Sequence, residues 1–158
     1  MKLHISLFLS FITFALLASA NASPKKKSGK VSDGVSLGAL RVEQLVHPIG
    51  IDTETPRLSW QLVSNQQDVM QTAYHVLVAS SPELLAKDEG DLWDSGKVSS
   101  DASHLVSYAG KPLKSNLRCY WKVKSYTTKG ETPWSEPALW TMGLLSESHW
   151  KGQWIGMD

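Results

Sequence analysis

The fold of this chain is decided by residues 56–62, which read Pro-Arg-Leu-Ser-Trp-Gln-Leu. Their apolar side chains fall on every second residue, at Leu58, Trp60 and Leu62, and polar side chains occupy the positions between them. Alternation with a period of two and one apolar face is typical of a half-buried β-strand. We therefore expect a strand here that begins after Pro56, with the Trp60 ring at the centre of the core.

Two more segments of the same kind follow. Residues 74–79 read Tyr-His-Val-Leu-Val-Ala, and residues 93–98 read Trp-Asp-Ser-Gly-Lys-Val. Short runs rich in β-branched and aromatic residues, separated by loop-forming residues, are typical of an antiparallel sandwich. Apolar side chains lie on both faces of the 74–79 segment, so we expect that strand to be covered on both sides.

Residues 80–86 predict a single helical turn between these strands. Ser81 can cap the turn, and Pro82 fits the first helical position because its missing N–H has no partner to lose there. Residues 92–98 and 104–108 then predict two short strands, and residues 109–112, which contain Gly and Pro, predict a turn.

Residues 113–125 form the most diagnostic stretch, Leu-Lys-Ser-Asn-Leu-Arg-Cys-Tyr-Trp-Lys-Val-Lys-Ser. Alternation places four side chains on its inner face: Cys119, Trp121, Val123 and Ser125. Lys122 and Lys124 share the opposite face. A Gly-containing turn then leads to Trp-Ser-Glu-Pro at 134–137 and to an apolar alternation at 138–142. This order resembles the end of a fibronectin type III domain, in which a leucine precedes a corner tyrosine by six residues.

The corner itself departs from that pattern. Leu113 stands six residues before Cys119, which occupies the position of the tyrosine, and Tyr120 follows one residue later. A tyrosine corner anchors a loop through its hydroxyl group, and a buried thiol does this poorly. We expect a corner that is built differently or is weaker. We also expect the single cysteine to be a buried small hydrophobe rather than a reactive thiol.

Together these motifs resemble a more specific family, the N-terminal β-sandwich of bacterial α-L-rhamnosidases of glycoside hydrolase family 78, from about Leu40 to the last residue. The expected fold is all-β, an immunoglobulin- or fibronectin-III-like sandwich of about seven strands over residues 35–143. Residues 144–158 contain Trp-Lys-Gly-Gln-Trp-Ile-Gly and resemble a linker with the first strand of the family's next β-domain. The family's catalytic glutamates and its arginine-glutamate-arginine motif have no counterpart in this sequence.

The N-terminal residues predict export. Lys2 is followed by an apolar stretch over residues 5–17, shorter than the ~20 residues that span a bilayer, and small residues precede position 22. We expect a cleaved signal peptide over 1–22, a periplasmic or extracellular location and no membrane contact after cleavage. Residues 23–34 are basic, and we expect a disordered leader rather than a nucleic-acid or lipid-binding patch. The formal net charge of +1 gives no reason to expect a nucleic-acid partner.

The candidate catalytic or metal-binding residues are acids and histidines. The richest acidic cluster is Asp88, Glu89, Asp91 and Asp94, and the histidines after the signal are His47, His75, His104 and His149. An inverting glycosidase needs two carboxyl groups ~6.5–9.5 Å apart, and calcium needs spaced loop ligands. No second acidic cluster faces the first, and the histidines lack ligand spacing. We therefore expect a solvated acidic turn, with no catalytic residue, cofactor or metal.

Four aromatic residues could form a carbohydrate-binding platform: Trp93, Tyr108, Tyr126 and Trp134. We favour the alternative that they complete the core or face a neighbouring domain. The expected function is that of a non-catalytic accessory module of an exported α-L-rhamnosidase, packed through an exposed apolar patch on later domains of that enzyme. The alternative is a free-standing secreted carbohydrate- or protein-binding module, which the fold alone does not exclude. The resemblance at 150–156 favours the enzyme.

Overall fold

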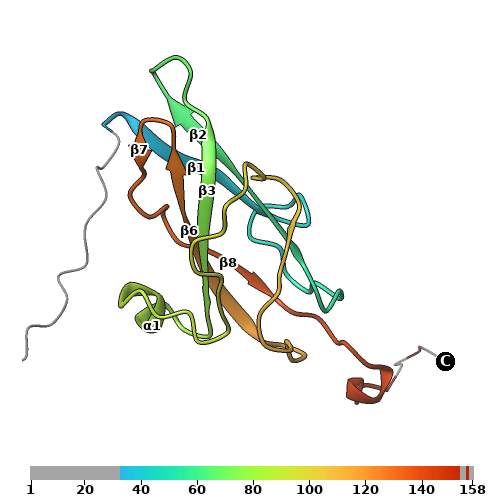
Figure 1. Cartoon of the computed structure of the whole chain (residues 1–158). Helices are drawn as coiled ribbons and strands as arrows, with labels where there is room; N and C mark the ends of the chain where they lie inside the picture. The colour runs from blue at the N-terminus through green and yellow to red at the C-terminus, as the bar shows by residue number, and fades with distance from the viewer. Residues whose placement is uncertain (1–32, 154–155, 157–158) are drawn as a thin grey trace, which may run out of the picture.

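The structure is a computed structural model that describes residues 33–153 and residue 156. The predicted signal peptide, 1–22, and all but the last two residues of the predicted leader lie outside the described residues. Within the described part, no helix is long and apolar enough to cross a membrane. The described residues form two antiparallel sheets with one short helix beside them (Figure 1).

The smaller sheet has three strands in the order β1-β2-β5, and the larger has five, with β4-β3-β6-β7 in order and β8 also paired to β6. The strands are β1 (Val35–Val42), β2 (Arg57–Ser64), β3 (Gln71–Ala79), β4 (Trp93–Asp94), β5 (Val106–Ser107), β6 (Arg118–Thr127), β7 (Gly130–Glu131) and β8 (Ala138–Thr141). The all-β sandwich is confirmed. The described part contains eight strands instead of about seven, because two-residue pairings such as β7 count as strands.

The core lies between the two sheets, with Trp60 of β2 at its centre as predicted. Trp60 is 2 % exposed and meets Tyr74 of β3 edge to face, with 5.3 Å between the ring centroids. Its indole N–H donates to Oε1 of Gln71 at 3.0 Å, and the hydroxyl of Ser125 donates to the same oxygen at 2.7 Å. A buried amide therefore joins the two sheets by meeting the polar groups of both.

Strand β3 is covered on both faces, as its apolar pattern predicts. Its inward side chains, Tyr74, Val76 and Val78, belong to the main core. On the opposite face Leu77 and Ala79 pack against Leu85 of helix α1 (Pro82–Ala86). The predicted helical turn is confirmed in detail. The Ser81 hydroxyl accepts the N–H of Leu84 at 3.3 Å, and Pro82 occupies the start of the helix.

The predicted strand over 92–98 is much shorter than expected, since only β4 pairs regularly with β3. The Ser95 hydroxyl accepts the backbone N–H of Val76 at 2.8 Å and so replaces a ladder bond. Gly96 follows with a φ of +58°, which turns the chain out of the strand. Val98 returns to make a single bridge with Tyr74. The predicted 104–108 strand is likewise reduced to β5, with Leu105 at a φ of +53°.

Most sheet edges are irregular. On the side of β6 that faces away from β3, the stretch between β7 and β8 contains Pro133 and Pro137, which cannot donate to a ladder. Strand β1 carries a register shift between Gly38 and Arg41, with Ala39 at a φ of +50°. β4 and β5, the remaining edges, are two residues each. Long uninterrupted pairing is thus confined to the interior of the sandwich.

The corner expected at Cys119 is built differently, as the missing tyrosine predicts. Cys119 is fully buried, and that burial raises the pKa of its thiol to about 12. The hydroxyl that anchors a loop belongs instead to Tyr108, whose oxygen lies 2.7 Å from the carbonyl of Lys111 and 3.1 Å from that of Leu92. Tyr108 therefore does from the opposite side of the core what a corner tyrosine does.

The chain leaves the sandwich after β8 as a segment that projects from one end of the molecule (Figure 1). A 3₁₀ turn, Glu147–His149, lies in this segment, and Ser146 caps it. The strand predicted near the C-terminus includes Trp154 and Ile155, which lie outside the described residues. That part of the predicted domain organisation stays a prediction.

Candidate functional site

The acidic residues after helix α1 do not converge on one site. The carboxylate of Asp91 accepts the backbone N–H and the hydroxyl of Ser80 at 2.8 and 2.7 Å. Asp94 lies 2.6 Å from Nε2 of His75 on the outer face of the larger sheet. Among the described residues, no three His, Cys, Asp or Glu side chains are placed to hold a metal ion. These carboxylates instead fix the connection between β3 and β4.

Asp88, the first of the predicted acids, pairs with a lysine that the structure buries. Lys122 of β6 is 7 % exposed, and its Nζ donates to the carbonyl oxygen of Leu85 at 2.6 Å and to Oδ1 of Asp88 at 2.5 Å. The hydrogen bond from Lys122 lowers the pKa of Asp88, and a further hydrogen bond from Trp134 acts in the same direction. The pair ties the end of α1 to the larger sheet.

The four candidate platform aromatics lie on two different sides of the larger sheet. Tyr108 is 4 % exposed and meets Trp93 edge to face at 5.4 Å, so both belong to the core. Trp134 and Tyr126 lie on the outer face, where lysine ammonium groups already cover them. Lys122 and Lys124 place Nζ 5.1 and 5.0 Å from the centroid of Trp134, and Lys97 places Nζ 4.0 Å from that of Tyr126. The four rings do not make one platform.

The four predicted histidines are equally scattered. His47 contacts Leu139, His75 contacts Asp94, His104 contacts Gln44, and His149 contacts Ser115. Each of these imidazoles takes part in a different local contact, and no two of them share a partner in these contacts. The structure thus brings the candidate acids, aromatics and histidines together in pairs that stabilise the fold.

The most unusual surface is one that the sequence interpretation did not identify. We call it the apolar loop, residues 43–50, which connects β1 to the segment before β2. Three of its apolar side chains face solvent: Leu45 is 55 % exposed, Val46 58 % and Ile49 87 %. The sequence does contain an indication of this surface, the run Leu-Val-His-Pro-Ile at residues 45–49, because loops between sandwich strands are usually polar.

The backbone of the apolar loop is held in an uncommon conformation. Val42 and Leu45 exchange two backbone hydrogen bonds of 2.9 Å, which closes a tight turn. The two central residues of this turn, Glu43 and Gln44, have φ angles of +48° and +68°, and His47 follows at +49°. Glycine and asparagine usually occupy such positions, because side chains with a Cβ are strained there. Three strained residues in one loop require strong local support.

That support comes first from Arg57 at the start of β2. Its Nε donates to both carboxylate oxygens of Glu43, and its Nη2 donates to Oε2 at a distance of 2.5 Å. Its backbone N–H also donates to Oε1 at 2.6 Å. The hydrogen bond from the Arg57 side chain is the main cause of the lowered pKa of Glu43. A forked, charge-assisted pair of this kind fixes orientation as well as position.

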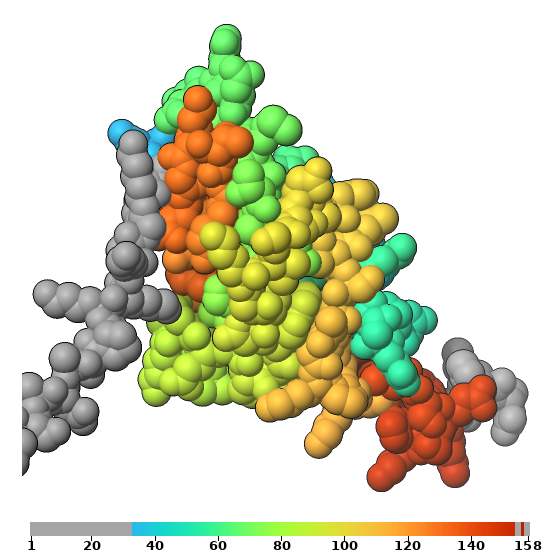
Figure 2. Space-filling view, viewed as in Figure 1, coloured from blue at the N-terminus to red at the C-terminus, as the bar shows by residue number. Residues whose placement is uncertain are grey.

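The other end of the apolar loop is bound to β8. Thr141 donates its N–H to the carbonyl of Pro48 at 3.0 Å and accepts the N–H groups of Gly50 and Ile51 at 3.0 and 2.9 Å. Gly143 then donates to the carbonyl of Ile51 at 2.7 Å. The loop therefore lies beside the point where the chain leaves the sandwich. Figure 2 shows that the teal part of the chain, which leads from β1 to β2, lies next to the red C-terminal segment.

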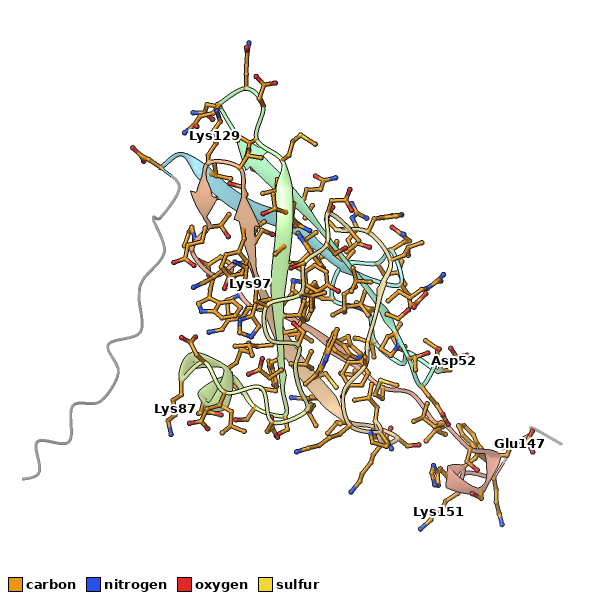
Figure 3. All side chains as sticks on the ribbon, in the orientation of Figure 1. Asp52, Lys87, Lys97, Lys129, Glu147 and Lys151 are labelled. Carbon is orange, nitrogen blue, oxygen red and sulfur yellow. The ribbon has the colours of Figure 1, made fainter. Side chains whose placement is uncertain are left out.

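A groove of about 640 Å³ lies at the same end of the molecule, between the turn before β6 and the C-terminal segment. Ser115 of that turn accepts the N–H of Leu145 at 2.9 Å, and its hydroxyl lies 2.7 Å from Nδ1 of His149. In Figure 3 the labelled Asp52, Glu147 and Lys151 mark this end. The C-terminal segment is thus fixed to the sandwich as far as the 3₁₀ turn.

Comparison with known proteins identifies the domain. The family described as "Rha78A-like, N-terminal immunoglobulin domain" matches residues 37–146, well over half of the chain. A solved structure of an α-L-rhamnosidase from Dictyoglumus thermophilum superposes with a TM-score of 0.77 at 35 % sequence identity, over 82 % of this chain and 15 % of that one.

Curated relatives carry the same name. An α-L-rhamnosidase of Streptomyces avermitilis is 45 % identical over 115 residues, which are 72 % of this chain and 11 % of that enzyme. One from Formosa agariphila is 35 % identical over 167 residues, which are 99 % of this chain and 17 % of that enzyme. The chain thus spans less than a fifth of the length of these relatives. It belongs to the family of Rha78A-like N-terminal immunoglobulin domains, a small part of the larger α-L-rhamnosidases.

Proposed function

We propose that this chain acts as the non-catalytic accessory module of an exported α-L-rhamnosidase that removes terminal L-rhamnose. The observation that carries the proposal is the family match over residues 37–146. The arrangement of the carboxyl groups supports it, since Asp88, Asp91 and Asp94 each engage a different structural partner. Glycoside hydrolysis needs two carboxyl groups that face one bond. The module contributes position and stability to the catalytic domains of the parent enzyme.

The first test is direct. The whole chain is incubated with an aryl α-L-rhamnoside, and we expect no release of the aryl group above background. Turnover by the isolated chain that survives repurification would contradict the proposal.

The second test uses the Formosa agariphila relative that aligns over 99 % of this chain. One variant of that enzyme lacks the aligned segment, and a second variant, the graft, carries this chain in its place. We expect the deletion to lower the melting temperature of the enzyme and the graft to restore most of it. An enzyme that melts at the same temperature with and without the segment would show that such a module has no accessory role.

A further inference from the structure

We infer that the apolar loop is the docking surface of this module and that its occupant is the domain that follows the module in the parent enzyme. The inference rests on the proposed function and deepens it by naming the contact. It is carried by three observations: the exposure of three neighbouring apolar side chains, the strained backbone that presents them, and the attachment of the loop to the strand from which the chain continues.

The exposure is concentrated at this one place. Leu45, Val46 and Ile49 lie within five residues of each other, and Ile49 at 87 % is the most exposed large apolar residue in the described part. The other exposed large apolar residues do not fall in one short loop: Val63 belongs to β2, Met70 precedes β3, and Leu144 and Trp150 lie six residues apart in the C-terminal segment. Single exposed apolar residues are ordinary, whereas adjacent ones mark an interaction surface.

The strain shows that the exposure is not incidental. An unconstrained loop with this sequence would relax its backbone and turn these side chains toward the core. A sequence suited to left-handed positions would carry glycine there. Here Glu43, Gln44 and His47 adopt those positions, and the Arg57 fork and the Thr141 bonds hold the loop at both ends. Strained residues persist where the surroundings over-determine them, and they gather at functional surfaces. A surface held rigid before contact loses little conformational freedom on binding.

The occupant follows from where the loop is attached. The loop pairs with β8, and the C-terminal segment begins two residues after that strand ends. The C-terminal segment is held against the sandwich as far as His149. The four residues from Trp150 to Gln153 reach about 14 Å at full extension. The relatives contain several times the length of this module. A domain joined by such a short tether meets the loop at an effective concentration of about millimolar, so a small apolar contact suffices to dock it.

The test compares a charge insertion in the loop with a matched insertion elsewhere. The loop variant carries Ile49→Asp, and the control variant carries Val63→Asp, which places the same single charge on an exposed valine of β2. Both are made in the whole chain and in the graft. In the isolated chain we expect every variant to melt within about 2 °C of the parent, because the altered side chains are largely solvated already.

In the graft we expect the parent and Val63→Asp forms to unfold in one transition. The loop variant is expected to unfold in two, with the module melting at the temperature of the isolated chain. One transition for all three would overturn the docking inference and leave the accessory role intact. A parent graft that melts like the deletion variant would overturn both. If the isolated chain dimerises through the loop in sedimentation while the graft variants behave alike, the occupant is a second copy, and our inference is wrong.

Discussion

Removing the charge partner of Lys122 should destabilise this domain more than removing the lysine's own charge. In Asp88→Asn the buried ammonium of Lys122 keeps its hydrogen bond to the Leu85 carbonyl but loses its carboxylate partner. Breaking a buried pair from one side costs ~3–5 kcal/mol, but the Asp88 side chain is 57 % exposed, and water replaces part of its contribution. We therefore expect a loss of about 1–2 kcal/mol.

Lys122→Met should cost less, about 0–1 kcal/mol. The methionine keeps the apolar contact of the stem beside Trp134, no buried charge remains, and the Asp88 carboxylate is already largely in water. Urea unfolding at pH 7 measures both variants. With a slope of ~1.5 kcal/mol per molar urea, the Asp88→Asn midpoint should fall by about 1 M and that of Lys122→Met by half of this or less.

The pH dependence supplies a second check. The pKa of Asp88 is lowered in the folded state, so its contribution is present above the unfolded pKa of ~3.9 and is lost as the pH falls through the folded pKa. The stability difference between the parent and Asp88→Asn should therefore shrink from pH 7 to about pH 3. A larger loss for Lys122→Met than for Asp88→Asn, or a difference that does not change with pH, would refute this account of the pair.

Three further predictions concern the core and the N-terminus. Trp60→Phe should destabilise the domain by about 1 kcal/mol more than Trp121→Phe in urea unfolding, because Trp60 donates to Gln71 while the Trp121 indole N–H has no hydrogen-bond partner in the described part of the chain. The reverse order would contradict this reading of the core. The Cys119 thiol, with its pKa raised to about 12 by burial, should react with a disulfide reagent at pH 8 only after denaturation; rapid labelling of the native protein would count against a buried thiol. Expressed with its own N-terminus in a Gram-negative bacterium, the chain should be recovered from the periplasm with a mass that corresponds to cleavage within residues 18–22, and an intact N-terminus would refute export.

Alternation along the strands predicted most of the fold. The inner faces of β2, β3 and β6 are those read from the sequence, because a period of two fixes which side chains share a face. The pattern does not say what covers the other face. The alternation correctly placed Lys122 on the face opposite the core. Its burial depends on helix α1, which packs against that face of the sheet in the folded structure.

Loop conformations could not be predicted in the same way. Left-handed φ angles occur at Glu43, Gln44 and His47, although none of these is glycine or asparagine. The local residue preferences therefore do not predict the turn. Arg57 imposes it from the neighbouring strand. The same holds for Tyr108, whose hydroxyl takes the role of the corner tyrosine by contacting the carbonyl of Lys111 and that of Leu92, which is sixteen residues away in the sequence. Both features depend on tertiary contacts that a reading of short motifs does not contain.

The irregular sheet edges have a consequence for how this module coexists with neighbouring domains. If a neighbouring domain contains a β-sheet, strand addition between the two is a hazard, because an open edge offers a row of unpaired N–H and C=O groups. In the described residues, β1 is interrupted between Gly38 and Arg41, β4 and β5 are two residues long, and Pro133 and Pro137 interrupt the remaining edge. None of these edges presents a long regular template. We therefore expect a neighbouring domain to engage this one through side chains, so that the two can fold next to each other without exchanging or mispairing strands.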